Sequence, residues 1–248
     1  MNEVEKLGLL KFDFLQLNNL RQISLTLDLI KERYGDLDFD IDQLETDDSE
    51  VFKTINEMKL EGLFQISGDA FVGKDYPIKD KETGAPLKNK DGSPRVFHAK
   101  GVMEIIGCSC FDDIVAPNAI GRPGPLALDV PTKYAEGKNN PDSIIYPHPL
   151  LETILKDTYG VLCYQEQLIK MSQILAGFTF AEADGLRKAC AKKVPEMLDL
   201  IEPKFRAGCK KNNISETVIN EMWHLCVEFG SYAFNRSLSF SEGILTNE

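Results

Sequence analysis

The sequence predicts a mainly helical protein with a minor β part, an α+β fold class. Apolar residues recur at helical spacing over long segments of the second half, a short segment near the start alternates, and residues 71–100 are rich in Pro, Gly and Lys. The 248 residues are 43% hydrophobic and 27% charged. These proportions suit a folded protein and exclude disorder, collagen and a membrane channel.

The first predicted elements are a strand and a helix. In residues 9–17, Leu10, Phe12 and Phe14 alternate with Lys11 and Asp13, so the apolar and charged side chains occupy opposite faces. Asn18 and Asn19 then offer an N-cap for a helix that Gly35 ends. Its apolar positions are Leu20, Ile23, Leu27, Ile30 and Tyr34.

Residues 71–100 are expected to form a surface excursion of strands and turns, because Lys90-Asp91-Gly92 is a hairpin signal. Two later apolar stripes predict helices that face the core. The first consists of Leu168, Ile169, Met171, Ile174, Leu175 and Phe178, and the second of Val218, Ile219, Met222, Trp223, Cys226 and Phe229.

Charge is distributed unevenly. The net charge of −11 argues against a general electrostatic attraction to nucleic acid, so any such contact needs a local basic patch. Residues 36–50 hold eight acids and no base, whereas residues 187–211 hold eight bases against three acids. The sequence therefore predicts one positive region within an acidic chain.

The expected location is cytoplasmic, with no membrane partner. No apolar run approaches the roughly 18 residues that span a bilayer. The first residues lack the layout of a secretory signal. Six cysteines without framework spacing indicate reduced thiols inside a cell.

Two early features have both a structural and a functional interpretation. Lys11 and Asp13 form a solvated face, or else a carboxylate on a rigid strand beside a cation, which suits a metal-bound phosphate. Arg122 stands between Gly121 and a Pro-Gly-Pro turn that cannot continue a helix. It is either an exposed arginine on a plain turn or a guanidinium on a stiff loop that suits phosphate oxygens.

Three later segments have the same two interpretations. Residues 164–167 open the first apolar helix, and their Tyr and Gln side chains provide either caps and core polar groups or hydrogen bonds to a base or sugar. Bases in 186–196 form a collar that ends at Pro195, either a solvated helix face or a phosphate contact; they are Arg187, Lys188, Lys192 and Lys193. Residues 231–237 combine aromatic, amide and cationic groups suited to a nucleotide, although a loop can contain them by chance; they are Tyr232, Phe234, Asn235 and Arg236.

The cysteines and histidines are interpreted as structural. Cys108 and Cys110 are spaced C-x-C, and no second pair or nearby histidine completes a tetrahedral zinc site. An unrelated metalloprotein that uses these two cysteines is the least favoured alternative.

Taken together and in this order, these segments resemble the bacterial replicative DNA polymerases of family C, the polymerase III alpha subunit. The resemblance covers about residues 3–237, with an interruption at 71–100. The motifs that carry it are LGLLKFDFL, FQIS (64–67), FDDIVA (111–116), RPGPL, TYG-x₃-YQEQ, ADGLRKA-x₂-KK and FNRS.

The resemblance implies template-directed nucleotidyl transfer with DNA primer–template and deoxynucleoside triphosphate (dNTP) as partners. It makes Asp13 one of three carboxylates that hold two catalytic Mg²⁺ ions, with Lys11 as a cation near the phosphates. It implies triphosphate contacts for Arg122, Arg187, Lys188, Lys192 and Lys193. It implies base or sugar contacts near Tyr232, Phe234 and Asn235, with Arg236 in the place of a lysine.

The sequence departs from the family pattern at four places. The aspartate-rich motif that supplies the other two carboxylates is not found in it. Ile66 and Ser67 follow FQ where an acid and a serine are usual, and Ala191 replaces a glycine. Leu238 follows FNRS where the family has a histidine.

The last departure has a possible explanation. SLSFSEGILTNE (237–248) resembles the opening block of an intein, in which a nucleophilic first residue precedes an apolar strand. On this interpretation Ser237 attacks the preceding carbonyl carbon in an N-to-O acyl shift. The alternative is a divergent or added tail.

The expected organisation is a last palm strand at 1–18, a fingers domain at 19–236 with the insertion at 71–100, and an intein-like tail at 237–248. The protein is expected to be a polymerase fragment that is inactive alone and needs the remaining polymerase fragments. The competing interpretation is a non-catalytic, polymerase-derived module that binds nucleic acid or a partner subunit.

Overall fold

The computed structural model describes residues 8, 18–36, 40–80, 83–230 and 233–247. The chain divides into two compact units, Met1–Leu44 and Glu45–Glu248. The described elements of the first unit are α2 (Asn18–Tyr34) and the 3₁₀ helix η1 (Ile41–Gln43). The helix expected after Asn18 is therefore confirmed. Gly35 follows it with a φ of +80°, a left-handed backbone that glycine adopts readily.

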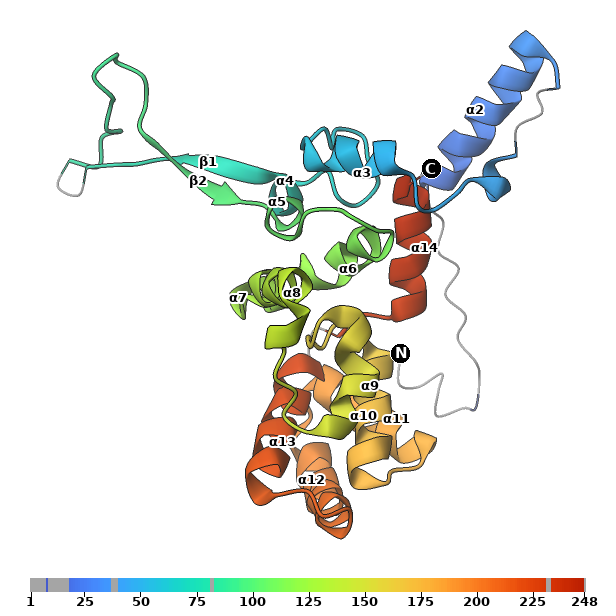
Figure 1. Ribbon diagram of the computed structural model, residues 1–248, viewed down its shortest axis with the longest axis vertical. Helices are drawn as coiled ribbons and strands as arrows, with labels where there is room; N and C mark the ends of the chain where they lie inside the picture. Colours follow the sequence, from blue (N-terminus) through green and yellow to red (C-terminus); the bar gives the residue numbers. More distant parts are fainter. Residues whose placement is uncertain (1–7, 9–17, 37–39, 81–82, 231–232, 248) are drawn as a thin grey trace. The chain divides into compact units, whose positions relative to one another are not determined.

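The second unit is mainly helical, which confirms the predicted fold class (Figure 1). Its helices are α3 (Ser49–Asn56), α4 (Asp69–Val72), α5 (Val102–Ile106), α6 (Asp112–Ile120), α7 (Pro123–Ala127), α8 (Val130–Asn139), α9 (Glu152–Leu155), α10 (Gln165–Ala176), α11 (Phe180–Lys192), α12 (Pro195–Lys211), α13 (Glu216–Gly230) and α14 (Arg236–Asn247). Short 3₁₀ helices lie between them, namely η2 (Pro141–Ser143), η3 (Pro149–Leu151) and η4 (Lys156–Thr158).

The predicted excursion at 71–100 is a β-hairpin. Strands β1 (Gly73–Pro77) and β2 (Val96–Lys100) pair antiparallel, with Gly73 opposite Lys100. At the Lys90-Asp91-Gly92 turn, the Asp91 carboxylate accepts hydrogen bonds from the backbone N–H and the hydroxyl of Ser93. Gly92 supplies a φ of +86°. The strand-and-turn prediction for this segment is therefore confirmed.

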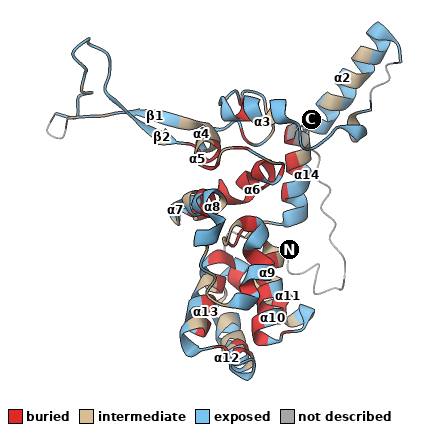
Figure 2. Ribbon diagram, viewed as in Figure 1, coloured by how far each residue is buried: buried red, intermediate tan, exposed pale blue. Residues whose placement is uncertain are grey.

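The largest core cluster lies among α10, α11, α12 and α13 (Figure 2). Both predicted apolar stripes contribute to it, because Leu168, Met171 and Leu175 of the first and five residues of the second are buried. Ile174 is an exception, since it is 37% exposed. It lies three residues from Met171 and one from Leu175, at the edge of a stripe that is narrower than the sequence indicated.

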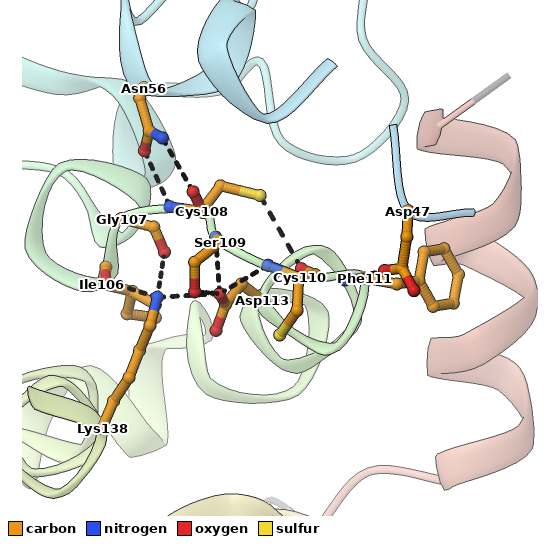
Figure 3. A network of polar contacts seen from close by, with 10 residues as sticks. All are labelled: Asp47, Asn56, Ile106, Gly107, Cys108, Ser109, Cys110, Phe111, Asp113 and Lys138. Carbon is orange, nitrogen blue, oxygen red and sulfur yellow. Dashed lines mark hydrogen bonds and ion pairs between the residues drawn. The ribbon is translucent and has the colours of Figure 1, made fainter. Parts of the chain in front are cut away.

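A buried ion pair joins several elements of the second unit (Figure 3). The Asp113 side chain in α6 is fully buried, and one of its carboxylate oxygens accepts hydrogen bonds from the Ser109 N–H (2.7 Å), the Ser109 hydroxyl (2.9 Å) and the Lys138 ammonium (2.8 Å). Lys138 of α8 also donates to the carbonyl of Gly107, just after α5. The FDDIVA motif therefore holds α5, α6 and α8 together.

Residues 236–247 form helix α14, so the apolar strand that the intein resemblance implies at 237–248 is wrong for the described part of this segment. The buried positions recur at helical spacing, which favours a helix over the period of two of a strand; they are Ser239, Glu242, Gly243 and Thr246. The Ser239 hydroxyl donates to the Val115 carbonyl at 2.6 Å. The helix thereby packs against α6, and a Cβ added at Gly243 would lie 2.7 Å from Val115 Cγ2.

Within the described ranges, the structure contains no helix that is both long enough and apolar enough to cross a membrane.

Candidate functional site

The candidate site is built on a parallel backbone pairing between two segments that lie about 70 residues apart in sequence. The N–H of Gln165 donates to the Phe234 carbonyl at 2.8 Å, and Tyr164 is bridged to Phe234. The Gln165 side chain also donates to the Ala233 carbonyl at 3.0 Å. The YQEQ and FNRS segments, both selected from the sequence, therefore lie side by side.

Gln167 fixes the first of these segments. Its side-chain oxygen accepts hydrogen bonds from the N–H groups of Cys163 (2.8 Å) and Tyr164 (2.9 Å), and its amide donates to the Thr158 hydroxyl at 2.8 Å. Gln167 is 5% exposed and Tyr164 is 3% exposed. For these two residues the structure favours the interpretation as caps and core polar groups, because neither side chain faces solvent.

Arg122 lies over the ring of Phe234, with its guanidinium carbon 5.1 Å from the ring centroid. It is exposed and stands directly before α7, in extended backbone. The Pro-Gly-Pro sequence does more than form the predicted turn, because Pro123 begins this short helix. Proline is well suited to the first helical position, where its missing N–H costs no hydrogen bond.

Arg236 repeats this arrangement on the neighbouring ring. Its guanidinium carbon lies 5.6 Å from the centroid of the Tyr164 ring, and the group forms a long ion pair with Asp157 at 3.8 Å. Because Tyr164 and Phe234 are bridged, two guanidinium groups are supported by two adjacent rings. Attraction between a guanidinium and a ring face restrains each arginine without neutralising its charge.

Glu166 holds the FNRS segment and was not selected from the sequence as a site residue. Its carboxylate accepts hydrogen bonds from the Asn235 side chain at 2.8 Å and from the Arg236 N–H at 3.0 Å. The Asn235 oxygen in turn accepts from the Leu238 N–H at 2.9 Å. An acid in the first turn of a helix was the available signal, but nothing local indicated its distant partners.

Arg187 connects α11 to the same network. It donates to Asp184 at 2.8 Å and to the side-chain oxygen of Gln165 at 3.3 Å. Lys188 also contacts Asp184, at 2.7 Å. These hydrogen bonds to Lys188 and Arg187 lower the pKa of the Asp184 carboxyl. Asp184 therefore holds two cations at one place beside the paired segments.

The predicted basic collar is only partly correct. Helix α11 ends at Lys192, and Lys193 caps it with a left-handed φ of +49°, so Lys193 lies outside the helix. Lys193 instead lines a mainly apolar cavity of about 670 Å³ together with Trp223 and His224. Lys192 shares a helix face with Lys188, four residues earlier. Ala191, which replaces the family glycine, continues the helix, and Pro195 begins α12.

Three predicted site residues, Lys11, Asp13 and Tyr232, lie outside the described residues. Within the described part, no group of three or more His, Cys, Asp or Glu side chains could hold a metal ion. Cys108 is buried, and this burial raises the pKa of its thiol to about 12. A buried thiol of raised pKa is a poor metal ligand, because the thiolate is the ligating form.

The described site therefore gathers Arg122, Phe234, Asn235 and Arg236 on one backbone pairing, with Arg187 and Lys188 joined to it through Gln165 and Asp184. Charged guanidinium groups, an exposed amide and aromatic rings suit a ligand that combines phosphate with a base. The fold and the site thus define a mainly helical module that brings arginines and aromatic rings together on one surface.

The comparisons with known proteins show what this module is similar to. Residues 96–213 match the family described as the bacterial DNA polymerase III alpha subunit finger domain. The chain is 37% identical over 246 residues to DNA polymerase III subunit alpha of Aquifex aeolicus (strain VF5), covering 99% of the chain and 19% of the relative. It is 33% identical over 241 residues to the subunit of the same name from Staphylococcus aureus (strain COL), covering 97% of the chain and 20% of the relative.

The finger-domain model thus covers residues 96–213, and relatives named DNA polymerase III subunit alpha match nearly the whole sequence, in agreement with the resemblance that the motif order indicated. The chain spans about a fifth of the length of the curated relatives it matches.

Proposed function

We propose that this chain supplies the nucleotide-binding fingers and one metal-binding aspartate of a template-directed DNA polymerase. The observation that carries the proposal is the pairing of the YQEQ and FNRS segments, which places Arg122 and Arg236 on adjacent rings. The same pairing brings Gln165 to Arg187. Motifs scattered over more than 110 residues thereby contribute to one surface.

In this proposal Arg122 is the first contact for the triphosphate. Among the described residues Arg122 has no ion-pair partner within 4 Å, whereas Arg187 and Lys188 share Asp184. A guanidinium with no carboxylate in direct contact gains more from a phosphate, because it has no ion pair to break. Its charge acts on the Glu242 carboxyl, whose pKa is raised by burial and lowered by Arg122. Arg187, Lys188 and Lys192 add positive charge, and Arg236 stands nearer to the base or sugar with Phe234 and Asn235.

The metal site is the least complete part of the proposal. The family implies two Mg²⁺ ions, and Asp13, with Lys11 beside it, is the one carboxylate carried over from the family motif. The residues identified do not fit the pair of ions, because one carboxylate cannot hold two ions about 3.5–4 Å apart. We therefore expect no polymerisation by these 248 residues alone and assign the other carboxylates to polymerase sequence outside them.

The test is primer extension with Mg²⁺, a primer–template and four dNTPs. The chain alone is expected to be inactive. Activity is expected when a polypeptide with the aspartate-rich palm motif is added, and it should be lost again with Asp13→Asn. Extension by the chain alone would refute the assignment of the missing carboxylates. Weak, salt-sensitive primer–template binding that no complementing polypeptide changes would favour the non-catalytic module.

The intein interpretation of the tail is a separate proposal, which the sequence of 237–248 supports. Ser237 is exposed at the second residue of α14. In an N-to-O shift its hydroxyl oxygen bonds to the Arg236 carbonyl carbon, the C–N bond breaks, and the hydroxyl proton passes to the released amine. Hydroxylamine cleavage after Arg236 in the presence of a complementary intein fragment would support the proposal. An inert mixture with a verified fragment would contradict it.

A further inference from the structure

The β1–β2 hairpin presents two different faces. Because side chains alternate along a strand, directly paired residues lie on the same face. Tyr76 pairs with Phe97, and Lys74 pairs with Ala99, so these four residues share one face. Arg95 stands two residues before Phe97, in the same alternation. We call this surface the aromatic face.

The aromatic face is exposed. Tyr76 is 51% exposed and Phe97 is 62% exposed, although large aromatic side chains usually gain by burial. Both lie on a narrow two-stranded ribbon that extends beyond α4 and α5 (Figure 1). Figure 2 shows the ribbon mostly in the colour of exposed residues. Two exposed rings on neighbouring strands provide a flat surface of the kind on which a base stacks.

The opposite face anchors the hairpin to the helices. The two ring nitrogens of His98 lie 2.6 Å from an Asp75 carboxylate oxygen on β1 and 2.8 Å from a Glu104 carboxylate oxygen on α5. At the base, a Cβ added to Gly101 would lie 2.1 Å from the Phe71 carbonyl oxygen, so only glycine fits there. These contacts hold the base of the ribbon, which leaves the aromatic face available.

The charge of the hairpin is opposite to that of the chain. Residues 73–100 contain seven Lys and Arg and four Asp and Glu, whereas the whole sequence carries a net charge of −11. The bases are Lys74, Lys79, Lys81, Lys88, Lys90, Arg95 and Lys100. A positive ribbon on an acidic protein complements a phosphodiester backbone.

We infer that the aromatic face of the hairpin binds single-stranded DNA, with Tyr76 and Phe97 stacking on unpaired bases and Arg95 meeting an adjacent phosphate. Lys74 pairs with the exposed carboxylate of Asp69, and it exchanges this weak surface pair for a second phosphate. The inference deepens the proposed function and rests on it for the choice of DNA, since a polymerase holds template ahead of the primer end. Rings combined with cations suit a single strand better than a duplex, whose bases are already stacked. An apolar protein partner would not require the positive charge.

The test measures binding of a fluorescein-labelled 20-nucleotide oligo(dT) to the whole chain by fluorescence anisotropy, without Mg²⁺ or triphosphate. The double variant Tyr76→Ala, Phe97→Ala is expected to bind about tenfold more weakly or worse, because each stacked base contributes on the order of 1–3 kcal/mol. The matched control is Val96→Ala, which removes an exposed apolar side chain from the opposite face and should leave the affinity unchanged. The conservative variant Tyr76→Phe should also bind normally.

A second measurement tests the charge. Loss of one phosphate contact in Arg95→Gln should reduce the salt slope of the binding constant by about 0.7. Equal affinities for the double variant and the control would overturn the inference, and so would full binding by Tyr76→Leu, Phe97→Leu, which keeps an apolar surface suited to a protein. Because the assay omits metal and triphosphate, a failure of primer extension contradicts the proposed function and leaves this result standing.

Discussion

The candidate site, built on the paired YQEQ and FNRS segments, and the β1–β2 hairpin are stabilised in different ways. The site depends on contacts between residues far apart in sequence, such as Glu166 with Asn235 and Gln165 with Phe234. The hairpin depends on local pairing and a turn, together with one histidine contact at its base. Substitutions of buried residues in the helical region should therefore lower the stability of the whole second unit, whereas substitutions in the hairpin should have only local effects.

The largest expected effect is at the Asp113–Lys138 pair. Lys138→Met leaves a buried carboxylate without its cation and should lower the free energy of unfolding by about 3–5 kcal/mol. Chemical denaturation monitored by circular dichroism measures the loss. Asp112→Asn is the matched control, because this neighbouring acid is exposed and should change stability by about 0.5 kcal/mol or less. Equal losses of stability in the two variants would contradict the stabilising role of the buried Asp113–Lys138 pair.

Gln167→Ala should come next. It removes the acceptor for two backbone N–H groups at Cys163 and Tyr164, and unsatisfied buried donors cost on the order of 1–3 kcal/mol each. We expect a loss of about 2–3 kcal/mol, with weaker triphosphate binding, because the pairing with Phe234 depends on this segment. Gln173→Ala, on the same helix and only partly buried, is the control. If Gln167→Ala left the free energy of unfolding unchanged, other contacts would have to hold the backbone at Cys163 and Tyr164.

Glu166→Ala should have a smaller and more local effect. It releases the Asn235 amide and the Arg236 N–H. Both hydrogen bonds are exposed, so water replaces the lost acceptor and we expect a change of only about 1–2 kcal/mol. Amide hydrogen exchange should become faster at 233–237 and remain unchanged in β1 and β2. Uniformly faster exchange across the hairpin would contradict the separation of the two regions.

The smallest effect should be a pH dependence at the base of the hairpin. Hydrogen bonds to Glu104 and Asp75 raise the pKa of His98 above 6.5. The contact is therefore fully present below pH 6.5 and is lost as the pH rises through the higher folded-state pKa. The hydrogen bond with His98 lowers the pKa of the half-buried Glu104 carboxyl, so Glu104 stays ionised over this range. An NMR titration should show β1–β2 shifts that follow His98 and are absent in His98→Asn.

Much of this architecture could be predicted from the sequence because its signals are local. The helix at 18–34 follows from apolar spacing and Gly35, and the hairpin from Lys90-Asp91-Gly92. The apolar stripe of α13 likewise gave Ile219, Met222 and Cys226 as core residues. The order of the motifs gave the resemblance to the polymerase III alpha subunit, with which the matches to residues 96–213 and to the relatives agree.

The remainder could not be predicted, because it depends on tertiary contacts. Nothing near Glu166 or Asp184 in the sequence indicates that they hold Asn235 and Arg187. The left-handed cap at Lys193, which takes that base out of the collar, depends on where α11 ends. Residues 237–248 contain helical spacing, but the resemblance to an intein block favoured a strand; packing of Ser239 and Gly243 against Val115 decides for the helix.

The most direct test of the account is equilibrium binding of a labelled dNTP to the whole chain. The account predicts saturable binding that Arg122→Ala weakens about tenfold or more, as expected for loss of a charged hydrogen bond worth about 1.5–3 kcal/mol. Lys170→Ala, which removes an exposed cation from α10 outside the network, should leave the affinity unchanged. Equal affinities for the Arg122→Ala variant and the unmodified chain, or no saturable binding, would contradict the assignment of this surface to the triphosphate.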